Sequence, residues 1–422
     1  METVEHESPE ARSNADRAFF LYQRLVSLFL PILIGVTSPI WLPQQQFPAV
    51  PAIGLLCPVP GLVDVGLLVL VVALSLSLLL AGPQFKWASA LWLSLALALG
   101  FAFLLNQHRF QPWAYQFAVL AIFFGLAPRE HARRLASWVA LSVYFYSALS
   151  KLNPSFVNEL GADFLATLGS FIGLAVEPTQ LGPWKWLALA FPAFEMLAFL
   201  LLLNQRTRRI GVVTAGSMHL SLILVLGPFG LNHSWGVLLW NVFFLAQAIL
   251  LFWFPLPAEV TETGGWKVRL AQAVCGIVLL FPTLELIGLG DPWPAWGLYA
   301  SHVGRTHCFV VRHAVASFPK DLQKYVDTDS SDDLFVPIDL GRWSIETTGA
   351  PIYPGERFSF AVGRALVLKT GAANFVRFVV ESPAGRFQDD RETDTFSGEE
   401  LTQQSHERFW LNTLPRDYYL RD

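Results

Sequence analysis

The sequence predicts an α-helical polytopic membrane bundle of about nine spans, followed by a small C-terminal α+β extracytoplasmic domain. Hydrophobic residues make up 53% of the 422 residues and charged residues only 15%, whereas a soluble domain usually carries about 25% charged residues. The charges gather toward the two ends of the chain, and long apolar runs fill the middle. We therefore predict a cytoplasmic N-terminal tail over residues 1–24, a transmembrane bundle over 25–290 and an extracytoplasmic domain over 291–422.

The apolar runs place the individual spans, because a helix needs roughly 17–25 apolar residues to cross the hydrocarbon core. The N-terminal residues lack the basic segment and cleavage site of a signal peptide, so the first run is expected to remain as an anchor. That run contains Pro31, which a bundle tolerates when neighbouring groups satisfy the freed carbonyl. The predicted spans are Leu25–Leu42, Leu62–Ala81, Trp87–Leu105, Trp113–Ala127, Leu135–Ser150, Trp184–Leu203, Ile210–Gly227, Trp235–Phe254 and Val268–Leu289.

The charges of the connecting loops predict the orientation. With a cytoplasmic N-terminus, twelve lysines and arginines fall on the cytoplasmic side, and three fall in or beside the short outer loops, at Arg109, Lys151 and Lys185. Basic residues favour the cytoplasmic side of short loops. An integral membrane protein with its C-terminal domain outside is therefore expected, in the inner membrane with the domain in the periplasm if the source is bacterial.

The C-terminal residues alternate between strand-like and helical patterns. Strands are predicted at Cys308–Val311, Leu334–Ile338 and Asn374–Val380. Helices are predicted at Pro319–Val326 and Ser397–Phe409, the second because Ser397 is a good N-cap with acidic residues in the following turn. Asp327–Asp333 reads as an acidic loop.

Composition also limits the partners. A net charge of −4 gives no reason to propose nucleic acid, and the cysteines lack metal-ligand spacing, so no metal site is predicted. Cys57 and Cys308 both fall on the oxidising outer side, where a disulfide joining the first outer loop to the C-terminal domain is one expectation. Cys275 lies within a span and is expected to be a packed thiol.

Lys151 stands at the outer end of the fifth span. Lys151 lies 16 positions after Leu135, which is about 24 Å along a helix. The ammonium is therefore expected just below the outer headgroups of a core about 30 Å thick. Tyr144, Ser147 and Lys151 share one helix face, which would turn the amine toward the bundle. A partly desolvated lysine gives up its proton more easily and can act as a base near neutral pH. A lysine that snorkels to the headgroups is the alternative.

Further polar residues are expected near the same membrane face. Gln107, His108 and Arg109 lie in the outer loop Asn106–Tyr115, and Asn232 and His233 lie in another outer loop. We interpret the first loop as part of a functional site, since histidine and arginine together are not needed for interfacial anchoring, and the second as a further candidate lining of that site. An interfacial loop with aromatic anchors is the alternative.

Two more polar residues fall near the middle of neighbouring antiparallel spans. Glu195 and His219 are expected to pair there, either as a buried polar relay for protons or as a structural hydrogen bond between helices. Glu285 is a third candidate member of such a relay.

The run from Val143 to Phe156 resembles the "YF-x-x-G-x-x-KL" segment of vitamin K-dependent γ-carboxylase and its bacterial relatives, the horizontally transferred transmembrane (HTTM) family. The resemblance extends over roughly Arg17 to Trp253. The chain departs from the family at Ala148, which stands in place of its glycine, and at Ser150, which stands in place of its other lysine. The runs Asn106–Trp113 and Pro292–Val303, in contrast, resemble a bacterial subgroup. By resemblance, Lys151 occupies the place of the base that deprotonates reduced vitamin K.

Other motifs of that family have counterparts here. Gln107-His108 resembles its Asn-His pair, whose histidine is implicated in stabilising a carbanion, and Glu195 resembles an acidic residue of the following helix. His219 and the run Phe229–Trp235 resemble its "FH…N" helix and loop.

The resemblance implies a carboxylase-like membrane enzyme that uses a lipid-soluble quinol, reduced vitamin K or menaquinol, and no metal. Lys151 would be the base, His108 or Arg109 would stabilise developing negative charge, and the substrate is unnamed. Two alternatives remain open. One is a non-catalytic scaffold that binds lipid or quinone, and the other is a proton-coupled transporter that uses Glu195, His219 and Glu285.

Overall fold

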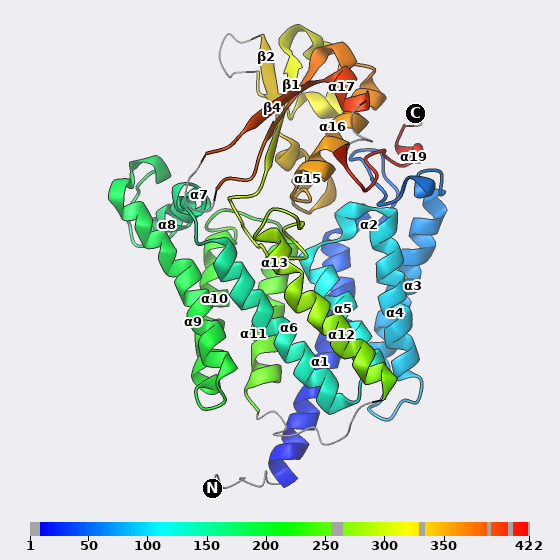
Figure 1. Cartoon of the computed structure of the whole chain (residues 1–422), viewed down its shortest axis with the longest axis vertical. Coiled ribbons are helices and arrows are strands. Elements are labelled where there is room, and N and C mark those ends of the chain that lie inside the picture. The colour runs from blue at the N-terminus through cyan, green and yellow to red at the C-terminus, as the bar shows by residue number, and fades with distance from the viewer. Residues whose placement is uncertain (1–8, 255–264, 329–333, 386–389, 404–407, 421–422) are drawn as a thin grey trace.

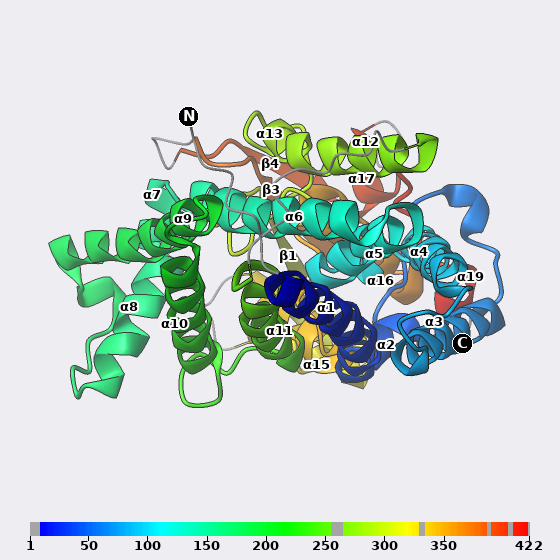
Figure 2. The same cartoon turned by 90° about the horizontal axis from the view of Figure 1, so that it is seen from below.

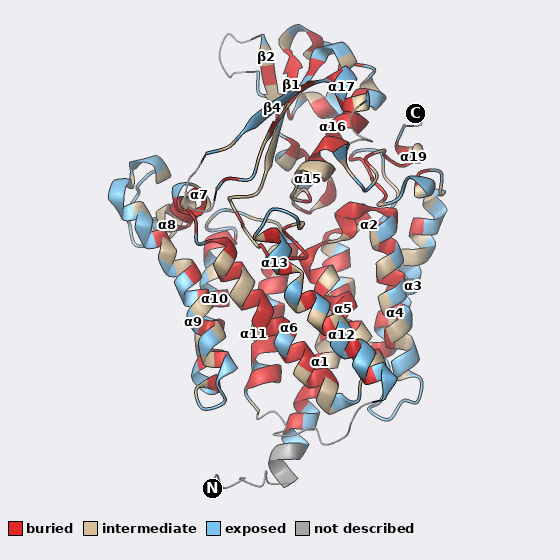
Figure 3. Cartoon of the chain, viewed as in Figure 1, coloured by how far each residue is buried: buried red, intermediate tan, exposed pale blue. Residues whose placement is uncertain are grey.

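The computed structural model describes residues 9–254, 265–328, 334–385, 390–403 and 408–420. A bundle of long helices carries a small domain with a β-sheet at one end, which we call the domain end of the bundle (Figure 1). Buried residues follow the helix faces that point toward one another, and many exposed residues lie on the bundle's outer surface (Figure 3).

Within the described residues, seven helical segments are long and apolar enough to cross a membrane. They indicate an integral membrane protein, as predicted, and each overlaps one of the predicted spans. The seven are α1 (Pro9–Val36), α3 (Gly61–Leu80), α4 (Ala88–Leu105), η4 with α9 (Gly182–Leu189 and Ala190–Leu203), α10 (Arg208–Leu226), α11 (Trp235–Phe252) and α12 with α13 (Trp266–Leu280 and Pro282–Glu285).

The remaining two predicted spans correspond to helices of a different character. The helix α5 (Pro112–Leu126) is apolar but short, and its residues are almost all buried. The helix α6 (Arg129–Ser150) begins with a charged turn that contains Arg129, Glu130 and Arg133. Both helices pack inside the bundle, where α5 contacts α4 and α6 contacts α9.

The structure also contains elements that the sequence analysis did not predict. The helix α1 begins at Pro9, inside the predicted N-terminal tail. Its backbone hydrogen bonds do not require apolar side chains, so the helix extends beyond the apolar run into polar residues. Between α6 and η4, the chain forms α7 (Pro154–Asn158), α8 (Leu160–Phe171) and the short η3 (Pro178–Gln180). The helix α8 projects sideways from the bundle (Figures 1 and 2).

The C-terminal domain is built on a four-stranded antiparallel sheet in the order β2-β1-β3-β4. The strands are β1 (Arg305–Val311), β2 (Phe335–Ile338), β3 (Val376–Glu381) and β4 (Thr393–Ser397). The three predicted strands are confirmed. Polar residues dominate β4, an edge strand that pairs only with β3, so it lacks the apolar pattern that reveals a buried strand.

Among the described residues, five α-helices accompany this sheet. The predicted helices appear as α14 (Lys320–Gln323) and α17 (Gly398–Gln403), and Ser397 and Glu400 bond to each other as a capping box. The sequence analysis missed α15 (Leu340–Thr348), α16 (Glu356–Thr370) and α19 (Asp417–Leu420), of which α16 packs on β1 and β3. Most of the predicted loop Asp327–Asp333 and part of the predicted helix Ser397–Phe409 lie outside the described residues.

The C-terminal domain rests directly on the bundle. Phe47 and Val50, which follow the short helix α2 (Ser38–Trp41), are buried in the hydrophobic core of the domain. Gly349 ends α15 at a φ of 70°, and a Cβ there would lie 2.6 Å from the carbonyl oxygen of Val36 at the end of α1. The close approach of these two backbones therefore requires glycine at this position.

A buried group of charges joins the C-terminal segment to the bundle. The carboxylate of Asp64, at the start of α3, lies 2.6 Å from Arg109 and 3.1 Å from Arg416. Arg416 also donates a 2.6 Å hydrogen bond to the carbonyl of Val59. All three charged side chains are almost completely buried, so each arginine depends on Asp64 for charge compensation.

The cysteines differ from one expectation. Cys57, Cys275 and Cys308 are all free, so the disulfide between Cys57 and Cys308 is not formed. Cys57 lies beside Asn412 and Leu414 of the C-terminal segment, whereas Cys308 lies in β1 and faces the core of the domain. Burial there raises the pKa of the Cys308 thiol to about 12. Cys275 is packed in the bundle core, as predicted.

We predict that Asp64→Asn lowers the free energy of unfolding by about 3–5 kcal/mol, because it leaves two buried guanidinium groups without their counter-charge. Thermal unfolding in detergent measures this effect, and limited proteolysis should show release of the C-terminal segment. Glu346→Gln is the control, since it removes a carboxylate whose partners Lys324 and Arg342 are exposed, and an exposed pair contributes under about 1 kcal/mol. Equal effects of the two variants would contradict the role given to Asp64.

Candidate functional site

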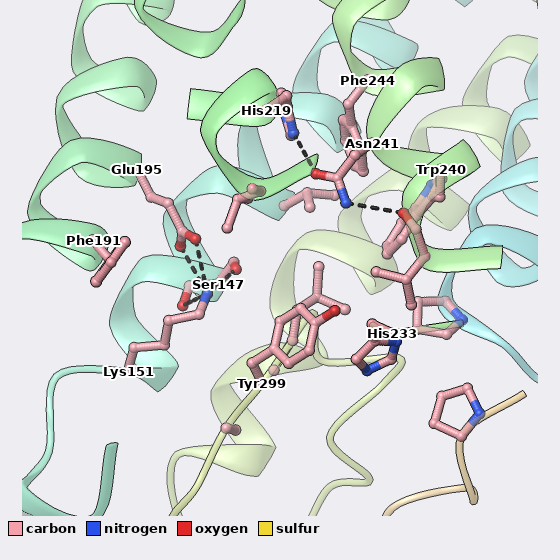
Figure 4. Close-up of a pocket in the computed structure, with 18 of the residues that line it drawn as sticks. Ser147, Lys151, Phe191, Glu195, His219, His233, Trp240, Asn241, Phe244 and Tyr299 are labelled. Carbon is pink, nitrogen blue, oxygen red and sulfur yellow. Dashed lines mark hydrogen bonds and ion pairs between the residues drawn. The ribbon is translucent and has the colours of Figure 1, made fainter. Parts of the chain in front are cut away.

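A cavity of about 540 Å³ lies near the domain end of the bundle. We call it the Lys151 cavity. Side chains of α6, α8, α9, α10 and α11 form its walls, and two stretches of the C-terminal domain, Pro292–Ala300 and Ala350–Pro354, contribute residues that cover it. Most of its lining is apolar, and a few polar side chains point into it (Figure 4).

Lys151 caps the end of α6 and turns into this cavity. Its side chain is only 3% exposed, so the ammonium is enclosed by protein and does not extend toward solvent as the snorkelling alternative requires. Its Nζ lies 2.9 Å from both carboxylate oxygens of Glu195 and 2.6 Å from Oγ of Ser147. Tyr144, Ser147 and Lys151 all line the cavity, so they share the face of α6 that borders it.

The expected pair between Glu195 and His219 is wrong. Glu195 binds the ammonium of Lys151, whereas His219 bonds to Asn241 (Figure 4). His219 also bonds to Tyr144. The physical reason is the difference in charge, because a buried carboxylate gains more from a buried ammonium than from a neutral imidazole. Both residues line the same cavity, but with separate partners.

The hydrogen bonds around His219 assign its tautomer. The Nδ2 of Asn241 donates to the carbonyl of Val237, so the Oδ1 of Asn241 faces His219 Nδ1 at 2.9 Å and must accept. His219 therefore carries its proton on Nδ1, and Nε2 accepts from the hydroxyl of Tyr144 at 3.0 Å. The imidazole also stacks on Phe244, with 7° between the ring planes. This wall of the cavity is a fixed, neutral polar patch.

His233 and Tyr299 face each other where the domain covers the cavity. Their rings meet edge to face at 5.7 Å, and both residues line the cavity. Within the described part of the chain, the buried hydroxyl of Tyr299 has no hydrogen-bond partner. Tyr299 also has a φ of 60° and Asn232 a φ of 49°, in the left-handed region that is costly for residues other than glycine. Asn232 itself does not line the cavity.

Sequence reasoning missed Tyr299. It belongs to the tryptophan-rich run that follows the last span, and aromatic residues there are equally expected of an interfacial anchor. Only tertiary packing brings Tyr299 against Phe164 of α8 and His233, at the cavity.

The loop between α4 and α5 divides into two functional parts. Gln111 and Trp113 line the Lys151 cavity, as expected for this loop. Gln107, His108 and Arg109 do not line it, because each is engaged elsewhere. Arg109 binds Asp64, and Gln107 bonds to Asn412 and Arg357. The loop therefore also anchors the C-terminal domain to the bundle.

His108 contacts the residues that cover the cavity but does not itself line the cavity. Its Nε2 lies 2.8 Å from the carbonyl oxygen of Pro351, and its ring packs between Phe47 and Phe358. Burial in these surroundings lowers the pKa of His108 to about 4, so the imidazole is neutral near pH 7. Since Pro351 lines the cavity, His108 positions the cover without contacting a ligand.

Glu285 is separate from the other polar residues. It lies 2.6 Å from His302, at the junction between the last helix of the bundle and the C-terminal domain. Neither residue lines the Lys151 cavity. Glu195, His219 and Glu285 thus have three different partners in the described structure, where no hydrogen bond between their side chains joins them directly.

No protein-family model, curated protein or solved structure matches this chain. Among the described residues, no group of three or more histidine, cysteine, aspartate or glutamate side chains is placed to hold a metal ion. The function is therefore argued from the Lys151 cavity itself.

We predict that protonation of His108 makes the fold less stable in acid. The folded protein keeps this imidazole neutral down to about pH 4, whereas the unfolded chain binds the proton below about pH 6.5. Stability is therefore lost as the pH falls from about 6.5 to 4, by about 3 kcal/mol in total. Thermal unfolding of wild type and His108→Gln across this range measures the contribution.

The variant should show a flatter dependence on pH than wild type does. His313→Gln is the control, because it removes an exposed imidazole from the C-terminal domain and should retain the wild-type slope. An unchanged slope in His108→Gln would contradict the assignment.

Proposed function

We propose that this protein is a carboxylase-like membrane enzyme that uses a lipid-soluble quinol, as its resemblance to the HTTM family implies. The observation that carries the proposal is the buried ion pair of Lys151 and Glu195 in the wall of a largely apolar cavity. Ionised groups inside a membrane bundle are costly, and they usually serve binding or proton transfer.

The proposed topology has nine spans, with α5 and α6 as the fourth and fifth. Both pack among the seven longer apolar segments, and the connecting loops keep the strong bias of basic residues toward the N-terminal side. In this arrangement the N-terminus is cytoplasmic, and the domain end of the bundle faces outward. The Lys151 cavity would then open near the outer leaflet.

The residues present fit a quinol of the reduced vitamin K or menaquinol type. A volume of about 540 Å³ falls within the range of roughly 300–1,000 Å³ that is common for small-molecule sites. Apolar side chains such as Phe191 and Leu168 would hold an isoprenoid tail. Lys151, Glu195 and the unpartnered hydroxyl of Tyr299 would hold the polar ring. Such a quinol, when bound, supplies the reducing equivalents for O2.

The contacts of Lys151 define how the chain would handle a proton. Its ammonium has three N–H donors, and these face Ser147 and Glu195 in a geometry that suits the charged form. A hydroxyl brought to this wall would pass its proton to the pair. Lys151 first passes a proton to Glu195, and its neutral amine then takes the proton of the hydroxyl. Lys151 is therefore the base of the pair, Glu195 holds the proton that Lys151 gives up, and the re-formed ammonium stabilises negative charge on the hydroxyl oxygen.

The other predicted residues take different roles in this proposal. Tyr144 and His219 form a neutral polar wall, and His233 lies beside Tyr299. We assign no charge-stabilising role to His108 or Arg109, since neither lines the cavity. The substrate that would receive carboxylation stays unnamed.

We predict that the purified protein in nanodiscs converts vitamin K hydroquinone or menaquinol, with O2, into the quinone epoxide and water. Lys151→Ala should lower the rate at least about 100-fold, in the range of lost acid–base catalysis. Lys151→Arg should fail as well, because arginine does not give up its proton. Chromatographic separation of the epoxide measures each rate, and Lys267→Ala, at an exposed lysine at the start of α12, is the control.

Two outcomes would contradict different parts of the proposal. Full activity of Lys151→Arg would remove Lys151 as a base. Saturable binding of the quinol to folded protein, with no epoxide from either quinol, would favour the non-catalytic scaffold.

We predict that Tyr299→Phe weakens binding of menaquinone by about 1 kcal/mol, roughly fivefold, because one hydrogen bond to the ligand is lost. The same change should raise the free energy of unfolding by about 1 kcal/mol in the absence of ligand, since a buried unpaired hydroxyl disappears. Quenching of tryptophan fluorescence measures binding, and thermal unfolding measures stability. Tyr325→Phe, which removes a hydroxyl in the C-terminal domain away from the cavity, should leave binding unchanged. Unaltered binding by Tyr299→Phe would contradict the assignment.

A further inference from the structure

The segment between α6 and α9 forms a sideways projection that we call the lateral arm, residues 160–187. It comprises α8, η3 and the first part of η4. The arm starts directly after α7, which begins only three residues beyond Lys151 at the end of α6, and it leads without a break into α9. Both ends of the arm are therefore held at the level where these two helices end, and its middle projects away from the bundle (Figures 1 and 2).

The projecting part of the arm exposes an unusual amount of apolar surface. Ile172 is 76% exposed and Trp184 is 70% exposed. Over residues 164–187 the only charged residues are Glu177 and Lys185. An apolar surface of this kind on a protein marks a site of contact with a membrane or another protein. The exposed large apolar residues of the arm are Phe171, Ile172, Leu174, Val176, Trp184, Trp186 and Leu187.

The polar contacts of the segment lie at its base. Glu159, just before α8, forms an ion pair with Arg305 at the start of β1. Lys185 donates a 2.7 Å hydrogen bond to Asn158 at the end of α7. The segment thus has a polar base against the C-terminal domain and an apolar projection directed away from it, which is the polarity expected at a boundary between water and lipid.

The arm also borders the Lys151 cavity. Leu165 and Leu168 of α8, with Leu187 of η4, line the cavity together with Ser221 of α10. Leu187 is 56% exposed, and Ser221 is exposed as well. Residues that line the cavity and are also exposed on the side of the bundle mark a lateral mouth next to the arm.

We propose that the lateral arm lies in the membrane leaflet on the side of the C-terminal domain, at the boundary between headgroups and acyl chains, and that it forms one rim of a lateral mouth of the Lys151 cavity. Lipid is the occupant that the geometry favours, because the arm leads directly into the membrane-type helix α9 and continues its apolar outer surface, which includes Phe194 and Leu197. Tryptophans such as Trp184 and Trp186 are typical of this depth in a bilayer. The placement of the arm does not depend on the reaction proposed for the cavity.

A spin label on the arm tests this placement. Ile172→Cys offers an exposed attachment site, while all three native cysteines are buried and free. The full-length protein is labelled and placed in nanodiscs, and power-saturation EPR compares collisions with O2, which concentrates in lipid, and with a neutral nickel chelate, which stays in water. We expect the label at 172 to collide several times more often with O2 than with the nickel chelate.

Two matched sites calibrate the result. Leu220→Cys places a label on the exposed apolar surface of α10, and Asp321→Cys places one on the exposed surface of α14 in the C-terminal domain. The label at 172 should give an O2-to-nickel ratio close to that at 220 and well above that at 321. Leu174→Cys repeats the measurement at a second exposed position in case the first variant does not insert.

The proposal is overturned by either of two results. A ratio at 172 and 174 equal to that at 321 would place the arm in water. Low collision rates with both reagents, accompanied by dipolar broadening between labels, would mean that a second copy of the chain covers the arm instead of lipid.

Discussion

The structure depends on one electrostatic constraint, that every buried charge at the domain end of an apolar bundle needs a partner of opposite charge. Lys151 meets Glu195, and Asp64 meets Arg109 and Arg416. An unpaired ion in such surroundings would cost several kcal/mol. Each of these contacts joins segments that are distant in sequence, so the pairing of charges also determines how the helices and the C-terminal domain are assembled.

The Lys151 cavity is a consequence of this assembly. The pair of Lys151 and Glu195 connects α6 to α9 on one side of the cavity, and the contacts of Asp64 hold the C-terminal segment against α3 and the loop that contains Arg109. The domain can then place Tyr299 beside His233, over an opening that the helices alone would leave uncovered. The cavity thus belongs to the interface between bundle and domain, and a variant that loosens the domain should also alter the cavity.

The apolar surface of the lateral arm and the polar wall of the cavity would serve two successive steps of ligand binding, which are entry and recognition. Under the proposed function, a lipid-soluble molecule would reach Lys151 without passing through water, and a mouth beside Leu187 and Ser221 would admit it from the side. Once inside, its polar end would meet the few groups that can exchange a proton or a hydrogen bond. This arrangement serves a catalytic site and a binding scaffold equally well, and the variants of Lys151 separate the two.

Hydropathy alone determined the membrane class of the protein and the positions of most of its helices, and it marked Lys151 as a candidate functional residue. An apolar stretch of sufficient length and a charge beside it are local properties of a sequence. Partners were decided only by tertiary structure. The position of Glu195 along its span suggests a pair with His219, yet packing brings Glu195 to Lys151. In the same way, Cys57 contacts Asn412 instead of Cys308. The edge strand β4 and the lateral arm also escaped prediction, since their environment depends on neighbours far away in the chain. Local patterns report which residues avoid water, whereas long-range packing decides which of them touch.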